Sequence, residues 1–174
     1  ANVAIGQNTL AQNTTGSVNL AIGNNAMTAN TTGTRNIAIG HTAYDASDTE
    51  NDNLAIGYQA MTTNTAGGTG NIAIGNYALD ALTSGDENVA IGKNAGGAMT
   101  TASENVAIGN AALATGNVTG GANVAIGSNA MNKNTTGENN TAVGKAAMDA
   151  NTTGVANVAV GKDALQDNTT GDAN

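Results

Sequence analysis

Several residue types are missing from this 174-residue chain, and each absence narrows what the protein can be. There is no cysteine, so the chain has neither a disulfide framework nor a thiolate metal site. Proline, tryptophan and phenylalanine are also absent, and there are only three tyrosines, whereas a globular core of this length usually relies on aromatic area. The apolar residues are mostly Ala, Val, Ile, Leu and Met, which predicts a thin, repetitive core.

Basic residues are scarce as well. Five Lys and Arg stand against 13 Asp and Glu, giving a net charge of −8. This balance argues against nucleic acid and anionic membrane surfaces as partners, because both bind clustered Lys and Arg. No apolar run reaches the roughly 18 residues of a membrane-spanning helix, and no signal peptide is visible. The pattern is already running at Ala1-Asn2 and recurs at Ala173-Asn174, so we expect a segment of a longer repetitive chain.

What the chain does contain is one short motif written ten times. Asn-Val-Ala-Ile-Gly, or a close variant, recurs every 17 residues, with two steps of 18. A fixed short period predicts a stack of equivalent structural units. We therefore interpret residues 1–174 as a single β-solenoid segment of ten coils. They start at Asn2, Asn19, Asn36, Asn53, Asn71, Asn88, Asn105, Asn123, Asn140 and Asn157.

The first five residues of each repeat predict a strand and a corner. Val3 and Ile5 should face one side and Ala4 the other, because strand side chains alternate. The glycine that follows indicates a positive φ or a close approach of two backbones. It recurs at Gly6, Gly23, Gly40, Gly57, Gly75, Gly92, Gly109, Gly127, Gly144 and Gly161.

The rest of the repeat predicts a second short strand and a loop. An Ala-Leu or Ala-Met pair such as Ala26-Met27 is assigned to that strand; the pair is missing at Ala95-Gly96, where Met99 supplies an apolar group from a shifted position. An Asn-Thr-Thr-Gly turn follows, as at residues 30–33. The extra residue of the two longer repeats falls near Gly67-Gly68 and within 115–120, where a loop accepts insertions.

These elements predict an all-β fold, a parallel β-roll or β-solenoid of ten coils of 17–18 residues. At about 4.8 Å per coil, ten coils make a rod on the order of 48 Å long. Equivalent residues then stack, and the first-position asparagines should form a ladder that satisfies its own amides. We assign this ladder a structural role.

The alanine between the two branched residues is the sharpest clue to assembly. It is invariant across the repeats: Ala4, Ala21, Ala38, Ala55, Ala73, Ala90, Ala107, Ala125, Ala142 and Ala159. If Val and Ile fill the coil, this alanine points outward, and its constancy indicates a partner chain packed closely against it, for example around a rotation axis. The competing interpretation is that the thin coil itself buries the alanine.

The repeat N-V-A-I-G-x-x-A-[LM] resembles the YadA-type head repeat of trimeric autotransporter adhesins. The variant Asn-Thr-Ala-Val-Gly at 140–144, with its Asn-Thr-Thr-Gly loops, is also similar to repeats of bacteriophage tail-fibre and virion-fibre proteins. The resemblance covers nearly the whole chain and implies left-handed coils and a homotrimer. Two features depart from it: the period is longer than that of the adhesin head, and no neck, stalk or anchor lies in this sequence.

Residues with reactive side chains are few. His41 is the only histidine, so neither a Ser-His-Asp triad nor a zinc ligand set is predicted, and it is interpreted as a surface substitution. Asp45, Asp48, Glu50 and Asp52 form the densest acidic stretch, but the calcium-loop pattern is absent. Lys93, Lys145 and Lys162 share one repeat position and are interpreted as a solvated edge. We expect no enzyme activity, no cofactor and no metal.

The sequence therefore predicts a structural and adhesive fibre segment on a cell surface, virion or extracellular filament. Its expected partners are further copies of itself and, through many weak contacts, host matrix, a glycan or a cell-surface receptor. The main alternative is an extracellular filament of single-chain solenoids joined end to end. A remote alternative is ice binding by the paired threonines, although adjacent threonines point to different sides and the row is interrupted.

Overall fold

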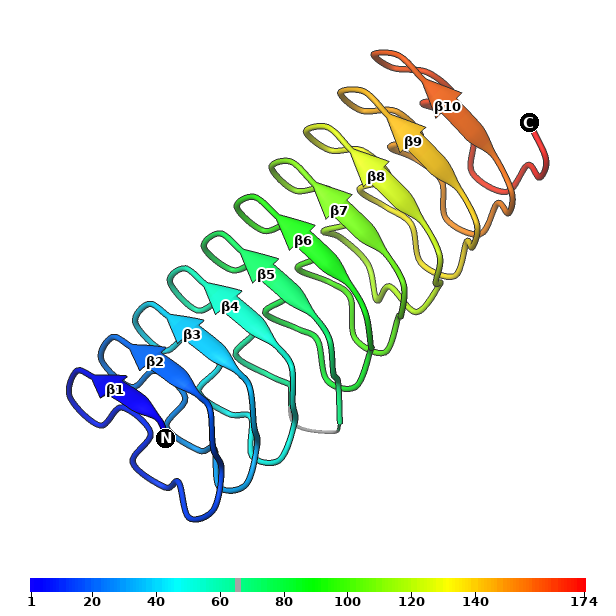
Figure 1. Ribbon diagram of the computed structural model, residues 1–174. Helices are drawn as coiled ribbons and strands as arrows, with labels where there is room; N and C mark the ends of the chain where they lie inside the picture. Colours follow the sequence, from blue (N-terminus) through cyan, green and yellow to red (C-terminus); the bar gives the residue numbers. More distant parts are fainter. Residues whose placement is uncertain (65–66) are drawn as a thin grey trace.

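The computed structural model describes residues 1–64 and 67–174, which form ten short strands joined by turns (Figure 1). All ten strands pair in parallel and in chain order within one sheet. The chain is thus an all-β parallel β-solenoid, as its repeat predicts. The strands are β1 (Val3–Ile5), β2 (Leu20–Ile22), β3 (Ile37–Ile39), β4 (Leu54–Ile56), β5 (Ile72–Ile74), β6 (Val89–Ile91), β7 (Val106–Ile108), β8 (Val124–Ile126), β9 (Thr141–Val143) and β10 (Val158–Val160).

Equivalent residues pair throughout the sheet. Ala4 pairs with Ala21, and the register persists across an 18-residue coil, where Ala55 pairs with Ala73. The extra residue of that coil falls outside the strands, in the stretch that contains exposed Gly67. The predicted placement of insertions in the turns is therefore correct, and every strand keeps the same neighbours in the stack.

The segment after each strand differs from the predicted second strand and is a run of turns. Met27 and Leu79, from the Ala-Met and Ala-Leu pairs, have φ values of 54° and 50°. This left-handed region bends the chain and interrupts a strand. The segment still bonds between coils: the Met27 N–H donates to the Ala43 carbonyl oxygen at 3.0 Å. The second-strand assignment is therefore wrong, because the two left-handed residues of this segment, such as Asn25 and Met27, fold the far wall back toward the sheet.

The corner glycine after each strand has the predicted backbone. Gly57 has a φ of 140°, a region that side chains disfavour. A Cβ added there would lie 2.5 Å from the carbonyl oxygen of Gly75 in the next coil. Positive φ and close contact between coils therefore both require glycine at this corner.

The interior of the rod is lined by alanines of the sheet and by larger residues of the turns. Ala21, Ala38 and their equivalents in the inner strands are 0% exposed, and so are Met27 and Leu79 on the opposite wall. An added Cβ at Gly96 would lie 3.5 Å from the Cβ of Ala90, so the alanine faces the interior across from the Leu/Met position. The prediction that Val and Ile fill the coil is wrong. The Leu and Met side chains take most of the space, leaving room for only a methyl group on the strand.

The fifth, sixth and seventh coils have an apolar residue at an interior position where other coils have asparagine. Where other coils place a buried asparagine such as Asn30, Asn134 or Asn151, these coils place Leu82, Met99 and Val118, all 0% exposed. The Met99 sulfur would lie 3.0 Å from a Cβ at Gly96, so Met99 fills the volume that the missing Leu or Met leaves. The predicted compensation by Met99 is confirmed.

The first-position asparagines form a buried ladder along the rod. The Asn88 Oδ1 accepts from the Asn105 backbone N–H at 3.0 Å, and the Asn88 N–H donates to the Asn71 Oδ1 at 2.9 Å. The Asn88 Nδ2 also donates to the Ala102 carbonyl oxygen at 2.8 Å. Each amide therefore joins two neighbouring coils and satisfies a turn carbonyl, which buried polar groups require.

Candidate functional site

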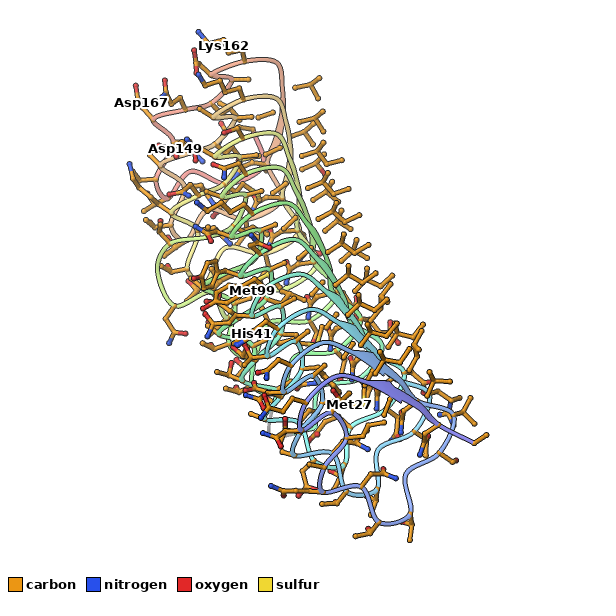
Figure 2. All side chains as sticks on the ribbon, turned by 90° about the vertical axis from the view of Figure 1, so that its left-hand side faces the viewer. Met27, His41, Met99, Asp149, Lys162 and Asp167 are labelled. Atoms are coloured by element: carbon orange, nitrogen blue, oxygen red, sulfur yellow. The ribbon has the colours of Figure 1, made fainter. Side chains whose placement is uncertain are left out.

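The most distinctive surface is an apolar one formed by the outward residues of all ten strands, here called the aliphatic face. It consists of two rows, the first and third residues of each strand, and Figure 2 shows branched carbon side chains projecting from the strand side of the rod. Every member is aliphatic except Thr141. The rows are Val3, Leu20, Ile37, Leu54, Ile72, Val89, Val106, Val124, Thr141 and Val158, and Ile5, Ile22, Ile39, Ile56, Ile74, Ile91, Ile108, Ile126, Val143 and Val160.

This face is open to solvent along the whole stack: most of its residues in the inner strands are half-buried, and those of the first and last strands are exposed. Ile37 and Ile91 in the interior of the stack are each 37% exposed, and at the last strand Val158 and Val160 are 61% and 71% exposed. Nine steps of about 4.8 Å make the face roughly 43 Å long. Soluble monomers rarely leave so extended an apolar patch in water, and such patches mark interaction surfaces.

The alternation of the strand produces this face. Because the alanines point inward, their branched neighbours on both sides must point outward. The hypothesis that the alanine row meets a partner chain is therefore wrong, since the inner alanines are covered by their own coil. The competing interpretation, burial within the thin coil, is correct, and any partner contact moves to the Val, Ile and Leu rows.

The acidic stretch of the third coil does not converge on one point. Glu50 is buried and turns inward, where its Oε2 accepts from the Ser47 hydroxyl at 2.7 Å and from the Asp48 backbone N–H at 2.9 Å. Asp52 instead pairs with Arg35 on the surface at 2.6 Å, and this guanidinium lowers the pKa of the Asp52 carboxyl. Among residues 1–64 and 67–174, no group of three or more His, Cys, Asp and Glu side chains is placed to hold a metal ion.

Glu50 therefore has a structural role in a coil that lacks the Asn-Thr-Thr-Gly turn. Replacing Glu50 by alanine removes the acceptor of the Ser47 hydroxyl and of the Asp48, Thr49 and Gly67 backbone amides. We expect the free energy of unfolding to fall by about 2–3 kcal/mol, because the buried Ser47 hydroxyl and three partly buried backbone amides lose their acceptor. Urea denaturation followed by circular dichroism measures it. Asp167→Ala, an exposed acidic residue, is the matched control, and equal stability of the two variants would contradict the role.

Threonine hydroxyls of the turns donate hydrogen bonds to the protein's own backbone. The hydroxyls of Thr14, Thr83 and Thr135 donate to carbonyl oxygens of the next coil at 2.9–3.0 Å. A hydroxyl that bonds to its own backbone has less capacity to order external water. This geometry weighs against ice binding.

Sequence reasoning missed a cluster of aromatic rings on another side of the coil. His41 and Tyr58 stack with centroids 5.5 Å apart, and Tyr58 meets Tyr77 edge-on at 5.3 Å. His41, labelled in Figure 2, lies away from the aliphatic face. The signal was present: three ring side chains occupy the same turn in three consecutive repeats. The interpretation of His41 as an isolated substitution is therefore wrong, because its ring belongs to this row.

The described part of the chain contains no helix long and apolar enough to cross a membrane. The predicted lysine edge residues Lys93, Lys145 and Lys162 are all exposed. Comparison of the chain with protein-family models, curated protein sequences and solved structures found no match.

Proposed function

We propose that this chain is a structural segment of a fibre, in which copies lie side by side with their aliphatic faces turned toward a common axis. The single observation that carries this proposal is the aliphatic face itself. It is continuous over all ten strands, and its one polar member is Thr141. Covering it removes apolar area from water, which is the main driving force for protein association.

A second copy of the same chain is the partner that this face fits. Equivalent side chains recur at each step of the stack, so two copies in parallel register place the same aliphatic residues opposite each other along the full length. Closed rotational symmetry lets every copy turn this same face toward the common axis, so that no copy leaves it uncovered. The two rows contain no charged residue, so the net charge of −8 is located outside the contact.

The resemblance to YadA-type head repeats supports three copies per fibre and left-handed coils. It also supports a location on a cell surface, virion or extracellular filament. The function is mechanical. Hydrogen bonds between coils run along the rod, and contacts between chains stiffen it across. Such a segment holds an attachment site at a distance and presents its outer surface in several copies.

The assembly is tested by sedimentation velocity on the chain and on a double variant. We expect the unchanged chain to sediment as a discrete trimer and Ile74→Lys/Ile108→Lys as a monomer. In a trimer, the two introduced lysines of each copy would lie near the shared axis. They would repel the same lysines of the other copies and would lose their hydration. Both side chains are partly exposed in the single chain, so the variant is expected to remain folded.

Asn110→Lys/Ser128→Lys is the matched control. It adds the same charge at the repeat position where Lys93 and Lys145 already occur, outside the aliphatic face. This control should remain a trimer. A monomeric unchanged chain would contradict the proposal, and open-ended polymers would favour the end-to-end filament.

A further inference from the structure

The aromatic rings that reach the surface of this chain are gathered on three consecutive coils, and Tyr77 among them is only partly exposed. Of three tyrosines and one histidine, Tyr44 is fully buried, and the other three are His41 after β3, Tyr58 after β4 and Tyr77 after β5. Tyr58 is 41% exposed. Because successive rings contact each other, His41 and Tyr58 support the orientation of Tyr77 at the end of the row.

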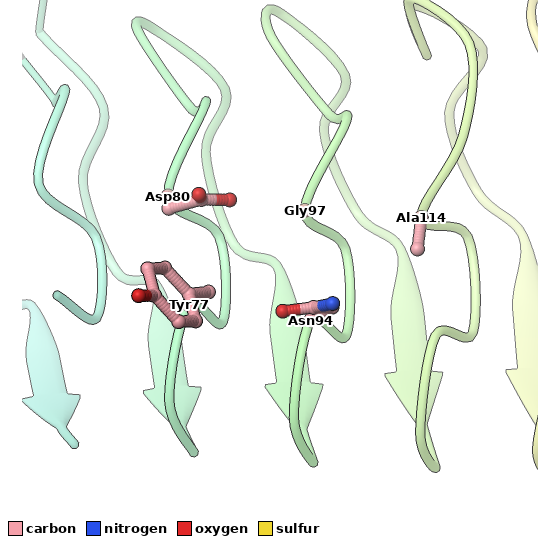
Figure 3. Close-up of a pocket in the computed structure, with 5 residues that line it drawn as sticks. All are labelled: Tyr77, Asp80, Asn94, Gly97 and Ala114. Carbon is pink, nitrogen blue, oxygen red and sulfur yellow. The ribbon is translucent and has the colours of Figure 1, made fainter. Parts of the chain in front are cut away.

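A recess of about 340 Å³ begins at Tyr77 and extends over the next two coils (Figure 3). Its lining residues are Tyr77, Asp80, Asn94, Gly97 and Ala114. Figure 3 shows Tyr77 and Asp80 on one coil, Asn94 and Gly97 beside them on the next coil, and Ala114 on the coil after that. The recess thus combines one aromatic face with two polar groups.

Gly97 creates the space. In other coils the same repeat position carries side chains such as Asp45, Asn132 and Asp149, whereas here it carries none. A Cβ at Gly97 would lie 3.2 Å from the Asp80 Oδ1, so a side chain would enter the recess. The backbone of Gly97 is not in the left-handed region, so backbone conformation does not require glycine at this position.

The polar groups are suited to hydroxyl groups of a ligand. Partial burial raises the pKa of the Asp80 carboxyl, and backbone N–H groups of its own turn act against this shift. A carboxylate accepts from hydroxyls, and an amide both donates and accepts. A pyranose ring offers an apolar C–H face to an aromatic ring and hydroxyls at its edge, so it matches both features of the recess.

Charge restricts the class of sugar. None of the five lining residues is cationic, one is anionic, and the chain carries a net charge of −8. A carboxylated or sulfated sugar would meet repulsion without a compensating cation. The recess therefore favours a neutral ring.

We propose that this recess binds one pyranose ring of a neutral glycan, stacked on Tyr77 and hydrogen-bonded by Asp80 and Asn94. The site is distinct from the aliphatic face and is present on a single copy of the chain, so it stands independently of the proposed assembly. A fibre made of several copies would present the site several times and gain avidity for a glycan-coated surface.

The experiment uses saturation-transfer NMR on the full chain with lactose, maltotriose, cellotriose and chitotriose, and with sialyllactose as the anionic counterpart of lactose. We expect at least one neutral sugar to bind and sialyllactose to bind more weakly than lactose. Tyr77→Asn should weaken binding by about tenfold or more through loss of the stacking face. Gly97→Thr should do the same by filling the recess.

Both variants are expected to fold. Asparagine already occupies the Tyr77 position in other coils, at Asn8, Asn25 and Asn129, and it tolerates the positive φ of 61°. Asn129→Ala, at the same repeat position three coils away, is the control and should leave binding unchanged. Three outcomes would overturn the proposal: no transfer to any neutral sugar, binding that survives Tyr77→Asn within about twofold, or preference for sialyllactose over lactose.

Discussion

Replacing Asn88 by alanine is expected to lower the free energy of unfolding by about 4 kcal/mol, because the substitution interrupts the buried asparagine ladder at its centre. The Asn105 backbone N–H loses its acceptor, the Ala102 carbonyl oxygen loses its donor, and the Asn71 Oδ1 loses one of its two donors from Asn88. These groups are buried, so water replaces the lost bonds poorly.

Urea denaturation followed by circular dichroism measures this loss. Each strand pairs only with its neighbours in the chain, so a defect at the sixth of ten coils also weakens the coupling between the two halves of the rod. A broader or two-step transition is expected to accompany the loss of stability. Asn110→Ala, an exposed asparagine of the seventh coil, is the matched control and should change stability by no more than about 0.5 kcal/mol. A fully cooperative transition with unchanged midpoint would show that the ladder is dispensable.

Replacing Ala125 by leucine is expected to destabilise the chain by about 3 kcal/mol, because the interior opposite β8 has no room for three further carbon atoms. Ala125 and Met131 of the same coil are both 0% exposed, and Ala125 pairs with alanines on both sides. The larger side chain must displace the far wall or twist the strand out of register. Thermal melting followed by circular dichroism detects the loss.

Val124→Leu provides the comparison one residue away. Val124 lies on the aliphatic face, and leucine occurs naturally at its position in Leu20 and Leu54. This variant should melt within a few degrees of the unchanged chain, since an outward substitution costs little. The opposite ranking, with Val124→Leu the more damaging, would mean that the strand faces the other way.

The periodic part of this structure follows from the sequence. A 17-residue period with an apolar triplet in each copy predicts parallel pairing of like with like, and the pairing of Ala4 with Ala21 follows that rule. The corner glycine was predictable because no other residue combines positive φ with close backbone contact. Insertions were predictable in the turns because a change within a strand would break the register of every neighbour.

The aromatic recess was harder to predict because it depends on differences between coils. Tyr58 and Tyr77 lie at adjacent positions of their repeats, so an alignment by repeat separates rings that the structure places 5.3 Å apart. In the sequence, Gly97 is one of 24 glycines and has no distinguishing mark. Its missing side chain leaves a recess only because Asp80 and Asn94 lie beside it in the structure.

The sequence by itself determined that Val and Ile point to one side of each strand and Ala to the other, since strand side chains alternate. Only the tertiary structure decided which side is inside. The left-handed residues after each strand, such as Met27 and Leu79, bend the far wall inward and fill the interior with their own side chains. The strand can then contribute only a methyl group, so Ala lies within the coil and the branched residues form the outer face. Burial depends on the volume left by the opposite wall, which a pattern of alternation does not specify.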